Sequence, residues 1–252
     1  MAGLALGVAS LGVCLELALP LHGAAQVICA LIAAVLLGLL SMRYIFHFDT
    51  LAADLRHPVL GSIAPTFAMS LMVLSKTLGM VSTTAGTALW LFAVLLHVVF
   101  LVVFAYNRFK TPDLDLMVPS WFVPPVGLIV ADVTFPGAAG LYPVAIIILA
   151  VGMAAYAVML PVMLYRIFFY SAIPAGAQPT IAIMAAPASL SLAGYLTVVK
   201  DPNLLVGGIL LGIALLMTLA IYFAFWRLLR LQFSPGYAAF TFPMAIGATA
   251  LY

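Results

Sequence analysis

The stretch Val118-Pro119-Ser120-Trp121-Phe122-Val123-Pro124-Pro125-Val126-Gly127 enters a long apolar segment at one proline and interrupts it with two more. A proline inside a helix removes a backbone donor and clashes with the carbonyl four residues earlier, which costs about 3 kcal/mol or more. Inside a membrane, neighbouring helices, hydroxyl groups or water in a protein-lined cavity can satisfy the carbonyls that lose their partners. The stretch therefore predicts a membrane-spanning helix that is broken near its middle.

The composition of the chain excludes a water-soluble domain. Of its 252 residues, 67% are hydrophobic and only 6% are charged, which is too little charge to cover a surface in water. No Asp, Glu, Lys or Arg occurs between Lys76 and Arg108, between Asp132 and Arg166, or between Arg166 and Lys200. Each of these gaps can hold a span of about 20 residues. The formal net charge of +2 and the lack of a basic run argue against nucleic acid as a partner. We expect a single all-α transmembrane domain in a lipid bilayer.

Apolar segments and turn residues divide the chain into nine expected spans. The polar connection between the second and third spans is expected to form a loop or a short interfacial helix. The expected spans are residues 2–19, 24–43, 57–78, 84–107, 118–135, 142–165, 178–199, 202–226 and 231–252.

Proline recurs in alternate spans. Nine of the 16 prolines lie in the third, fifth, seventh and ninth spans, at the entrance and near the middle: Pro58, Pro65, Pro119, Pro124, Pro125, Pro179, Pro187, Pro235 and Pro243. Such repetition indicates a repeated two-helix unit. Because irregular backbone is tolerated only beside protein or a wet cavity, we expect the broken odd-numbered helices to form an inner ring inside the smooth even-numbered ones.

Positive charge follows the same alternation. Seven of the nine Lys and Arg residues follow even-numbered spans: Arg43, Arg56, Arg108, Lys110, Arg166, Arg227 and Arg230. Lys76 and Lys200 are the two that follow odd-numbered spans. By the positive-inside rule, the side with seven charges is cytoplasmic. We therefore expect a multi-pass protein of the inner (plasma) membrane with a cytoplasmic amino terminus.

Few residues inside the spans can carry chemistry. Asp132 is the best candidate for binding a cation or relaying a proton, although an aspartate at a helix end near the interface is an equally good interpretation. His97 is expected to be a neutral, hydrogen-bonded structural histidine, because no second His or carboxylate lies three or four residues away. The sequence contains no metal-ligand, nucleophile or phosphate-loop motif, so we expect no catalytic residue, no metal and no cofactor.

Phe242 is the candidate gate of a transport pathway. It lies at the midpoint of the last expected span and directly precedes Pro243. A large apolar ring on a broken helix can close a narrow pore by filling and dewetting it. A packing or lipid-facing phenylalanine is the alternative interpretation, and Phe240 competes for the gating role.

Three motifs give the chain a resemblance to a known family. They are the opening stretch, His57-Pro58-Val59-Leu60-Gly61-Ser62 and Ala239-Phe240-Thr241-Phe242-Pro243. Together they resemble the tellurite-resistance/dicarboxylate transporter family of the voltage-dependent anion channel superfamily. That family includes the bacterial TehA proteins, the fungal malate and sulfite transporters and the plant guard-cell slow anion channels. The resemblance covers essentially the whole chain.

The resemblance implies ten helices in five hairpins with quasi-fivefold symmetry, of which this chain would hold nine. It also implies that the odd helices line a central pore, that Phe242 occludes it, and that the protein is a homotrimer with one pore per subunit. We expect the pore to be lined by Ser62, Pro65, Thr66, Ser120, Pro124, Pro125, Thr180, Pro187, Ser189, Thr241 and Pro243.

The expected function is passage of small anions or dicarboxylates, with hydroxyl groups replacing part of the hydration shell. Chloride, nitrate, malate, sulfite and tellurite all remain open as substrates. A proton-coupled C4-dicarboxylate carrier would share the fold. A membrane-embedded enzyme that uses Asp132 and His97 is an alternative of another class, and it requires both residues to face one cavity.

Overall fold

The computed structural model describes residues 1–110 and 112–252. Within these residues every regular element is a helix, and six of the elements are 3₁₀-helices. The α-helices are α1 (Ala2–Ala18), α2 (Ala24–Phe46), α3 (Phe48–Arg56), α4 (Leu60–Ile63), α5 (Thr66–Gly79), α6 (Thr83–Lys110), α7 (Val123–Val126), α8 (Val130–Val133), α9 (Tyr142–Phe169), α10 (Ala186–Val198), α11 (Leu204–Leu228) and α12 (Thr241–Thr249). The 3₁₀-helices are η1 (Leu114–Leu116), η2 (Pro119–Phe122), η3 (Gly127–Ile129), η4 (Ala139–Leu141), η5 (Ala175–Ala185) and η6 (Pro235–Phe240).

The long, smooth helices α2, α6, α9 and α11 form the outside of the molecule. Only 17% to 28% of the most apolar window of each is buried, so most of their aliphatic and aromatic side chains face outward, as expected in lipid. Each packs on inner elements: α2 on α1 and α5, α6 on α5 and α7, α9 on α7, α8 and α10, and α11 on α10 and η5. Pro161 lies inside α9 without ending it, so this proline does not divide the sixth expected span.

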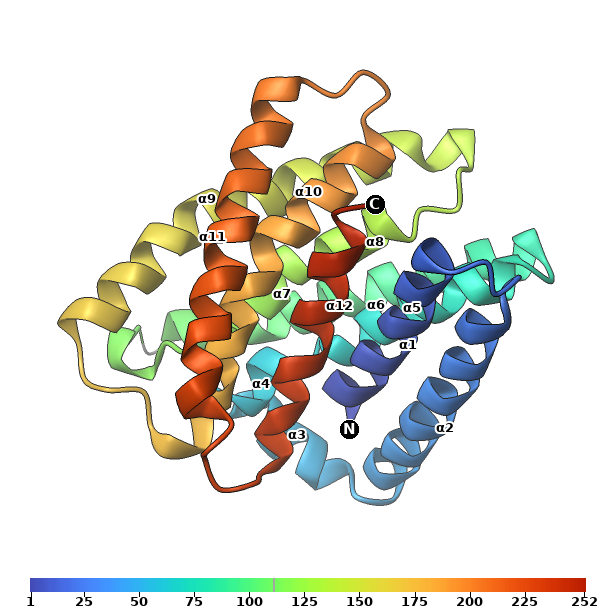
Figure 1. Ribbon diagram of the computed structural model, residues 1–252. Coiled ribbons are helices and arrows are strands. Elements are labelled where there is room, and N and C mark those ends of the chain that lie inside the picture. The colour runs from blue at the N-terminus through green and yellow to red at the C-terminus, as the bar shows by residue number, and fades with distance from the viewer. Residues whose placement is uncertain (111) are drawn as a thin grey trace.

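The inner helices α1, α5, α8, α10 and α12 form a closed ring. Each contacts the next in this order, and α12 returns to contact α1. In Figure 1, α1 and α12 lie side by side near the middle of the molecule, with α2 and α11 outside them. The segment Ala175–Val198 shows the difference in environment, because 83% of its apolar window is buried.

By length and composition, five helical segments of the described residues can cross a membrane, or six if α3 and Leu60–Gly79 count as one bent span. The remaining expected spans correspond to shorter or broken helices, including α1 and the segment Pro119–Val133. The chain is therefore an all-α membrane protein.

The breaks in the inner spans coincide with the prolines. The spans that contain Pro179 and Pro243 begin as the 3₁₀-helices η5 and η6 and continue as α10 and α12. In the fifth span, η2, α7, η3 and α8 alternate between the two helix types. At the third span the sharp bend, 102°, lies at the entrance, between α3 and the segment Leu60–Gly79, and the chain runs on past Pro65 in helical backbone.

The outer helix α6 supplies hydrogen-bonding side chains to the broken fifth span. On α6, the indole Nε1 of Trp90 donates to the carbonyl of Ala131 at 2.9 Å, and Nε2 of His97 lies 2.8 Å from the carbonyl oxygen of Pro124. These contacts satisfy carbonyls that an unbroken α-helix would satisfy internally. His97 is fully buried and takes part in this packing, which agrees with the structural role expected for it.

Candidate anion pathway

A small, partly open cavity lies within the ring. Residues of all five inner helices line it, together with Thr134, the C-cap of α8. Its volume for water-sized molecules is about 20 Å³, which is room for about one water molecule. The lining residues are Ser10, Val13, Val73, Lys76, Val130, Val133, Thr134, Leu190, Phe242, Ile246 and Thr249.

Phe242 is the second residue of α12 and forms part of this wall. Phe242 is only 8% exposed. Thr249, which lies seven residues later on α12, also lines the cavity, and this separation corresponds to about 10 Å along the helix axis. The ring of Phe242 therefore contributes at one end of the lined region and Thr249 at the other.

The start of α12 is seated closely on α1. A Cβ atom at Gly7 would overlap the side chain of Thr241 and would lie 3.2 Å from the backbone nitrogen of Phe242. The hydroxyl of Thr241 donates to the carbonyl of Ala238 at 2.8 Å and lies 3.4 Å from the carbonyl of Gly3. Contact with the glycine-rich face of α1 thus sets the position of Phe242.

Phe240, the competing gate residue, lies in a different environment. It ends η6 and joins an aromatic cluster, with its ring centroid 5.3 Å from that of Phe225 and 4.8 Å from that of Tyr237. It is not among the residues that line the cavity.

The eleven residues expected to line a pore are not part of the cavity wall in the described structure. All except Pro125 and Thr241 are nevertheless buried, at or near the breaks of the inner spans. The hydroxyls instead serve the backbone at these breaks. Ser62, Thr66, Thr180 and Thr241 each donate to the carbonyl three residues earlier, and Ser189 donates to the carbonyl four residues earlier.

One hydroxyl pair links two inner spans. The Oγ atoms of Ser62 and Ser120 lie 2.7 Å apart in the interior. This contact helps to fix the third span against the fifth. The hydroxyl of Ser62 also lies within donating distance of the Val59 carbonyl. The proton of each such hydroxyl would have to leave its backbone partner before it could bind an anion.

Asp132 is fully buried, and neither of its carboxyl oxygens has a hydrogen-bond partner among the described residues. A Cβ atom at Gly194 would lie 3.3 Å from the Cβ of Asp132, so this side of the aspartate faces α10. The structure therefore buries Asp132 inside the protein, in the short helix α8. Neither Asp132 nor His97 is among the residues that line this cavity. The described residues include no group of three or more His, Cys, Asp or Glu able to hold a metal ion.

Sequence reasoning found one cavity residue, Phe242, and missed the others. The missed residues follow a helical pattern that the sequence does contain: Ser10 and Val13, Val73 and Lys76, Val130 with Val133 and Thr134, and Phe242 with Ile246 and Thr249. These spacings of three, four and seven place each set on one helix face. The prolines drew attention to the breaks, whereas the cavity lies along the α-helical halves that follow them.

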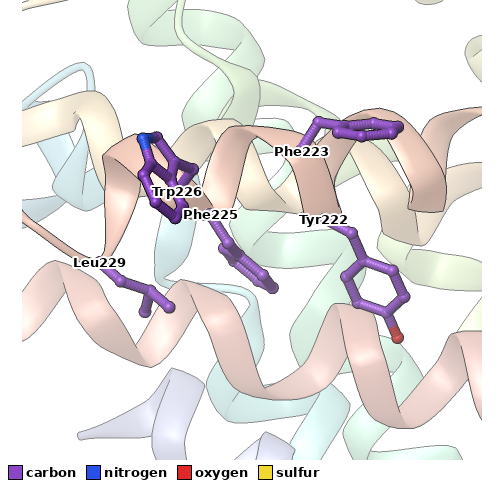
Figure 2. Close-up of a pocket in the computed structure, with 5 residues that line it drawn as sticks. All are labelled: Tyr222, Phe223, Phe225, Trp226 and Leu229. Carbon is purple, nitrogen blue, oxygen red and sulfur yellow. The ribbon is translucent and has the colours of Figure 1, made fainter.

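A larger surface depression lies outside the ring. Figure 2 shows its five lining side chains, which are Tyr222, Phe223, Phe225, Trp226 and Leu229 of α11 and its C-cap. Trp226 lies under the guanidinium of Arg230, at 4.3 Å from the ring centroid. Aromatic and basic residues at the end of an outer helix are typical of a membrane interface, so this depression does not belong to the pathway.

The whole chain, residues 1–252, matches the family described as Voltage-dependent anion channel. It is also similar to two proteins of Methanocaldococcus jannaschii, each named as an uncharacterized transporter. The first, MJ0762, is 25% identical over 236 residues, covering 84% of this chain and 69% of the relative. The second, MJ0576, is 26% identical over 227 residues, covering 81% of this chain and 65% of the relative. The chain thus spans about two thirds of the length of each relative. Together with the all-α membrane fold and the enclosed ring, these matches show that the chain belongs to the voltage-dependent anion channel family of membrane transport proteins.

Proposed function

We propose that the protein conducts small anions through the centre of the inner ring and that Phe242 is the gate. The observation that carries this proposal is the cavity wall, because all five inner helices contribute and Phe242 forms part of it. The phenyl ring of Phe242 borders a space of about 20 Å³ and competes for it with water and ions. A hydrated anion requires more room than one water molecule, so the structure fits a closed state.

The wall near Phe242 favours dewetting. Leu190, Ile246 and the valines that line the cavity offer no hydrogen bond to a partly dehydrated ion. Such a constriction excludes ions until the ring moves or the helices separate. Phe240 is the weaker candidate because its aromatic partners hold it outside the cavity wall.

Substitution of the gate tests the proposal. Phe242→Ala should raise chloride or nitrate flux in proteoliposomes by at least about tenfold, which corresponds to a barrier lowered by about 1.4 kcal/mol. Phe240→Ala is the matched control, since it removes the same ring two residues earlier, and it should leave the flux close to that of the unmodified protein. A rise in flux with Phe240→Ala alone would assign the gate to Phe240 instead. An unchanged flux in both variants would overturn the proposal.

The substrate and the assembly are parts of the same proposal. Malate, sulfite and tellurite are candidate anions beside chloride and nitrate, and an ion-replacement flux series ranks them. The family resemblance supports a homotrimer in the inner (plasma) membrane, which cross-linking in native membranes would detect as a trimer.

The basic residues at the carboxyl ends of α2, α6, α9 and α11 support a cytoplasmic amino terminus. Labelling of Lys76→Cys by an impermeant reagent from the cytoplasmic side alone would contradict that orientation.

A proton-coupled C4-dicarboxylate carrier is the second candidate. The observation in its favour is Asp132, because a buried carboxyl group without a partner is costly and is a common component of proton relays in membranes.

A further inference from the structure

Lys76 is the charged residue of the cavity wall. Among the described residues that line the cavity, all the others are aliphatic, aromatic or hydroxyl-bearing. Lys76 lies in the last turn of α5 and is exposed, whereas Phe242 is buried. The cavity therefore extends from a buried aromatic ring to a cation that can reach the surrounding space.

Two of the three hydroxyls of the wall already donate to backbone carbonyls, and the third belongs to Ser10. The Oγ1 atom of Thr134 donates to the Val130 carbonyl at 2.8 Å, and that of Thr249 donates to the Ala245 carbonyl at 2.9 Å. Each hydroxyl has one proton, and in these residues it is engaged. An ammonium group brings three donors and a full charge, so it is the group of this wall best able to attract an anion.

We propose that Lys76 is the anion-capture residue at the mouth of the pathway, where it binds a small inorganic anion or a carboxylate before passage beyond Phe242. The inference rests on the proposed anion function. A cation beside apolar, low-dielectric walls raises the local concentration of anions and lowers that of cations. Lys76 thereby sets the half-saturating anion concentration and the preference for anions over cations, while Phe242 sets whether the pathway is open.

A lysine in the last turn of a helix can also act only on the helix carboxyl end, which it stabilises through the helix dipole. Lys200 provides the matched control for that role. It lies two residues after the end of α10, another inner helix, and its ammonium lies 5.3 Å from the centroid of the Tyr142 ring. Lys200 does not line the cavity. Equal charge removal at the two positions therefore separates a cavity effect from a general effect of charge at this side of the membrane.

The first experiment measures flux in the Phe242→Ala background, with the chain otherwise complete. Lys76→Gln should raise the half-saturating chloride concentration roughly fivefold and shift the reversal potential toward that of a less anion-selective pathway. Lys76→Arg should retain the parent values, because it keeps the charge. Lys200→Gln should also retain them. Equal shifts from Lys76→Gln and Lys200→Gln, or none from either, would overturn the assignment.

The second experiment does not require an open gate. The thermal unfolding midpoint of the protein with Phe242 intact is measured in detergent, in sodium chloride against sodium gluconate at equal ionic strength. Binding to the folded state should raise the midpoint with chloride concentration. Lys76→Gln should abolish that rise and Lys200→Gln should preserve it. A chloride-dependent midpoint that requires Lys76, together with an unchanged flux in Phe242→Ala, would refute the gating role of Phe242 and support the capture site. A chloride effect that is absent or independent of Lys76 would remove the capture site and leave the gate.

Discussion

At the scale of single residues, the position of Phe242, the proposed gate, depends on the absence of a side chain at Gly7. Gly7 lets α12 approach α1 closely enough that Phe242 lines the cavity, because a Cβ atom at position 7 would overlap the side chain of Thr241. Small residues at helix contacts are the usual means by which membrane helices pack closely, since lipid offers little hydrophobic force for association. We infer that the close contact between α1 and α12 is a condition for gate closure.

The substitution Gly7→Ala tests this inference. Overpacking a close contact costs about 1–3 kcal/mol, so the thermal unfolding midpoint in detergent should fall. The start of α12 should also shift away from α1 and raise the basal anion flux while Phe242 is still present. Gly38→Ala is the control, because no atom lies within 4 Å of a Cβ at Gly38. A Gly7→Ala variant as stable and as tightly closed as the Gly38→Ala variant would contradict the proposed seat.

At the scale of elements, smooth and broken helices depend on each other. The broken fifth span leaves carbonyls without intrahelical donors, and α6 supplies a donor through the indole of Trp90, which bonds to Ala131. The broken spans also use their own hydroxyls for the same purpose. The outer helix α6 therefore stabilises the break of the fifth span as well as shielding the ring from lipid.

Trp90→Phe should destabilise the protein through this hydrogen bond. The substitution keeps an aromatic ring but leaves the buried Ala131 carbonyl without its donor, at a cost of about 1–3 kcal/mol. Trp226→Phe makes the same change at a residue that is 75% exposed, and it should have little effect. Thermal unfolding followed by circular dichroism compares the two variants, and equal midpoints would show that the Trp90 bond contributes nothing measurable.

How much of this arrangement could be predicted from the sequence depends on the range of the interaction. Proline chemistry is local, so the broken spans and the inner position of the odd helices could be predicted, and the all-α membrane class is confirmed. The partner of Trp90 lies 41 residues away, and sequence spacing carries no information about it. The pore-lining role of Thr66 and Thr180 stays a prediction; in the structure each hydroxyl donates to the carbonyl three residues earlier, as hydroxyls beside a backbone break commonly do. The sequence indicates Lys76 only as a charge that helps to set the orientation, because its place in the wall depends on how five helices meet.

At the scale of the whole molecule, the question is whether the ring operates as a channel or as a carrier. The cavity and Asp132 are separate features: the five inner helices line the cavity, whereas Asp132 packs toward α10 and is not part of the cavity wall. A channel needs only the first of these features. A proton-coupled carrier needs the carboxyl group to exchange protons in step with substrate movement, which requires coupling between the two places.

The variant Asp132→Asn separates the two mechanisms. A channel predicts that chloride flux through the Phe242→Ala protein responds to membrane voltage but not to a pH gradient, and that adding Asp132→Asn changes it by less than about twofold, the scale of an effect below 0.5 kcal/mol. A carrier predicts malate uptake that follows the inward proton gradient in the protein with Phe242 intact and that disappears in Asp132→Asn. Asp201→Asn is the control, since Asp201 is an exposed aspartate in the connection between α10 and α11. Because Asn keeps the size of the side chain but cannot release a proton, loss of proton-driven malate uptake in Asp132→Asn alone would contradict the channel mechanism and assign the buried carboxyl group to coupling.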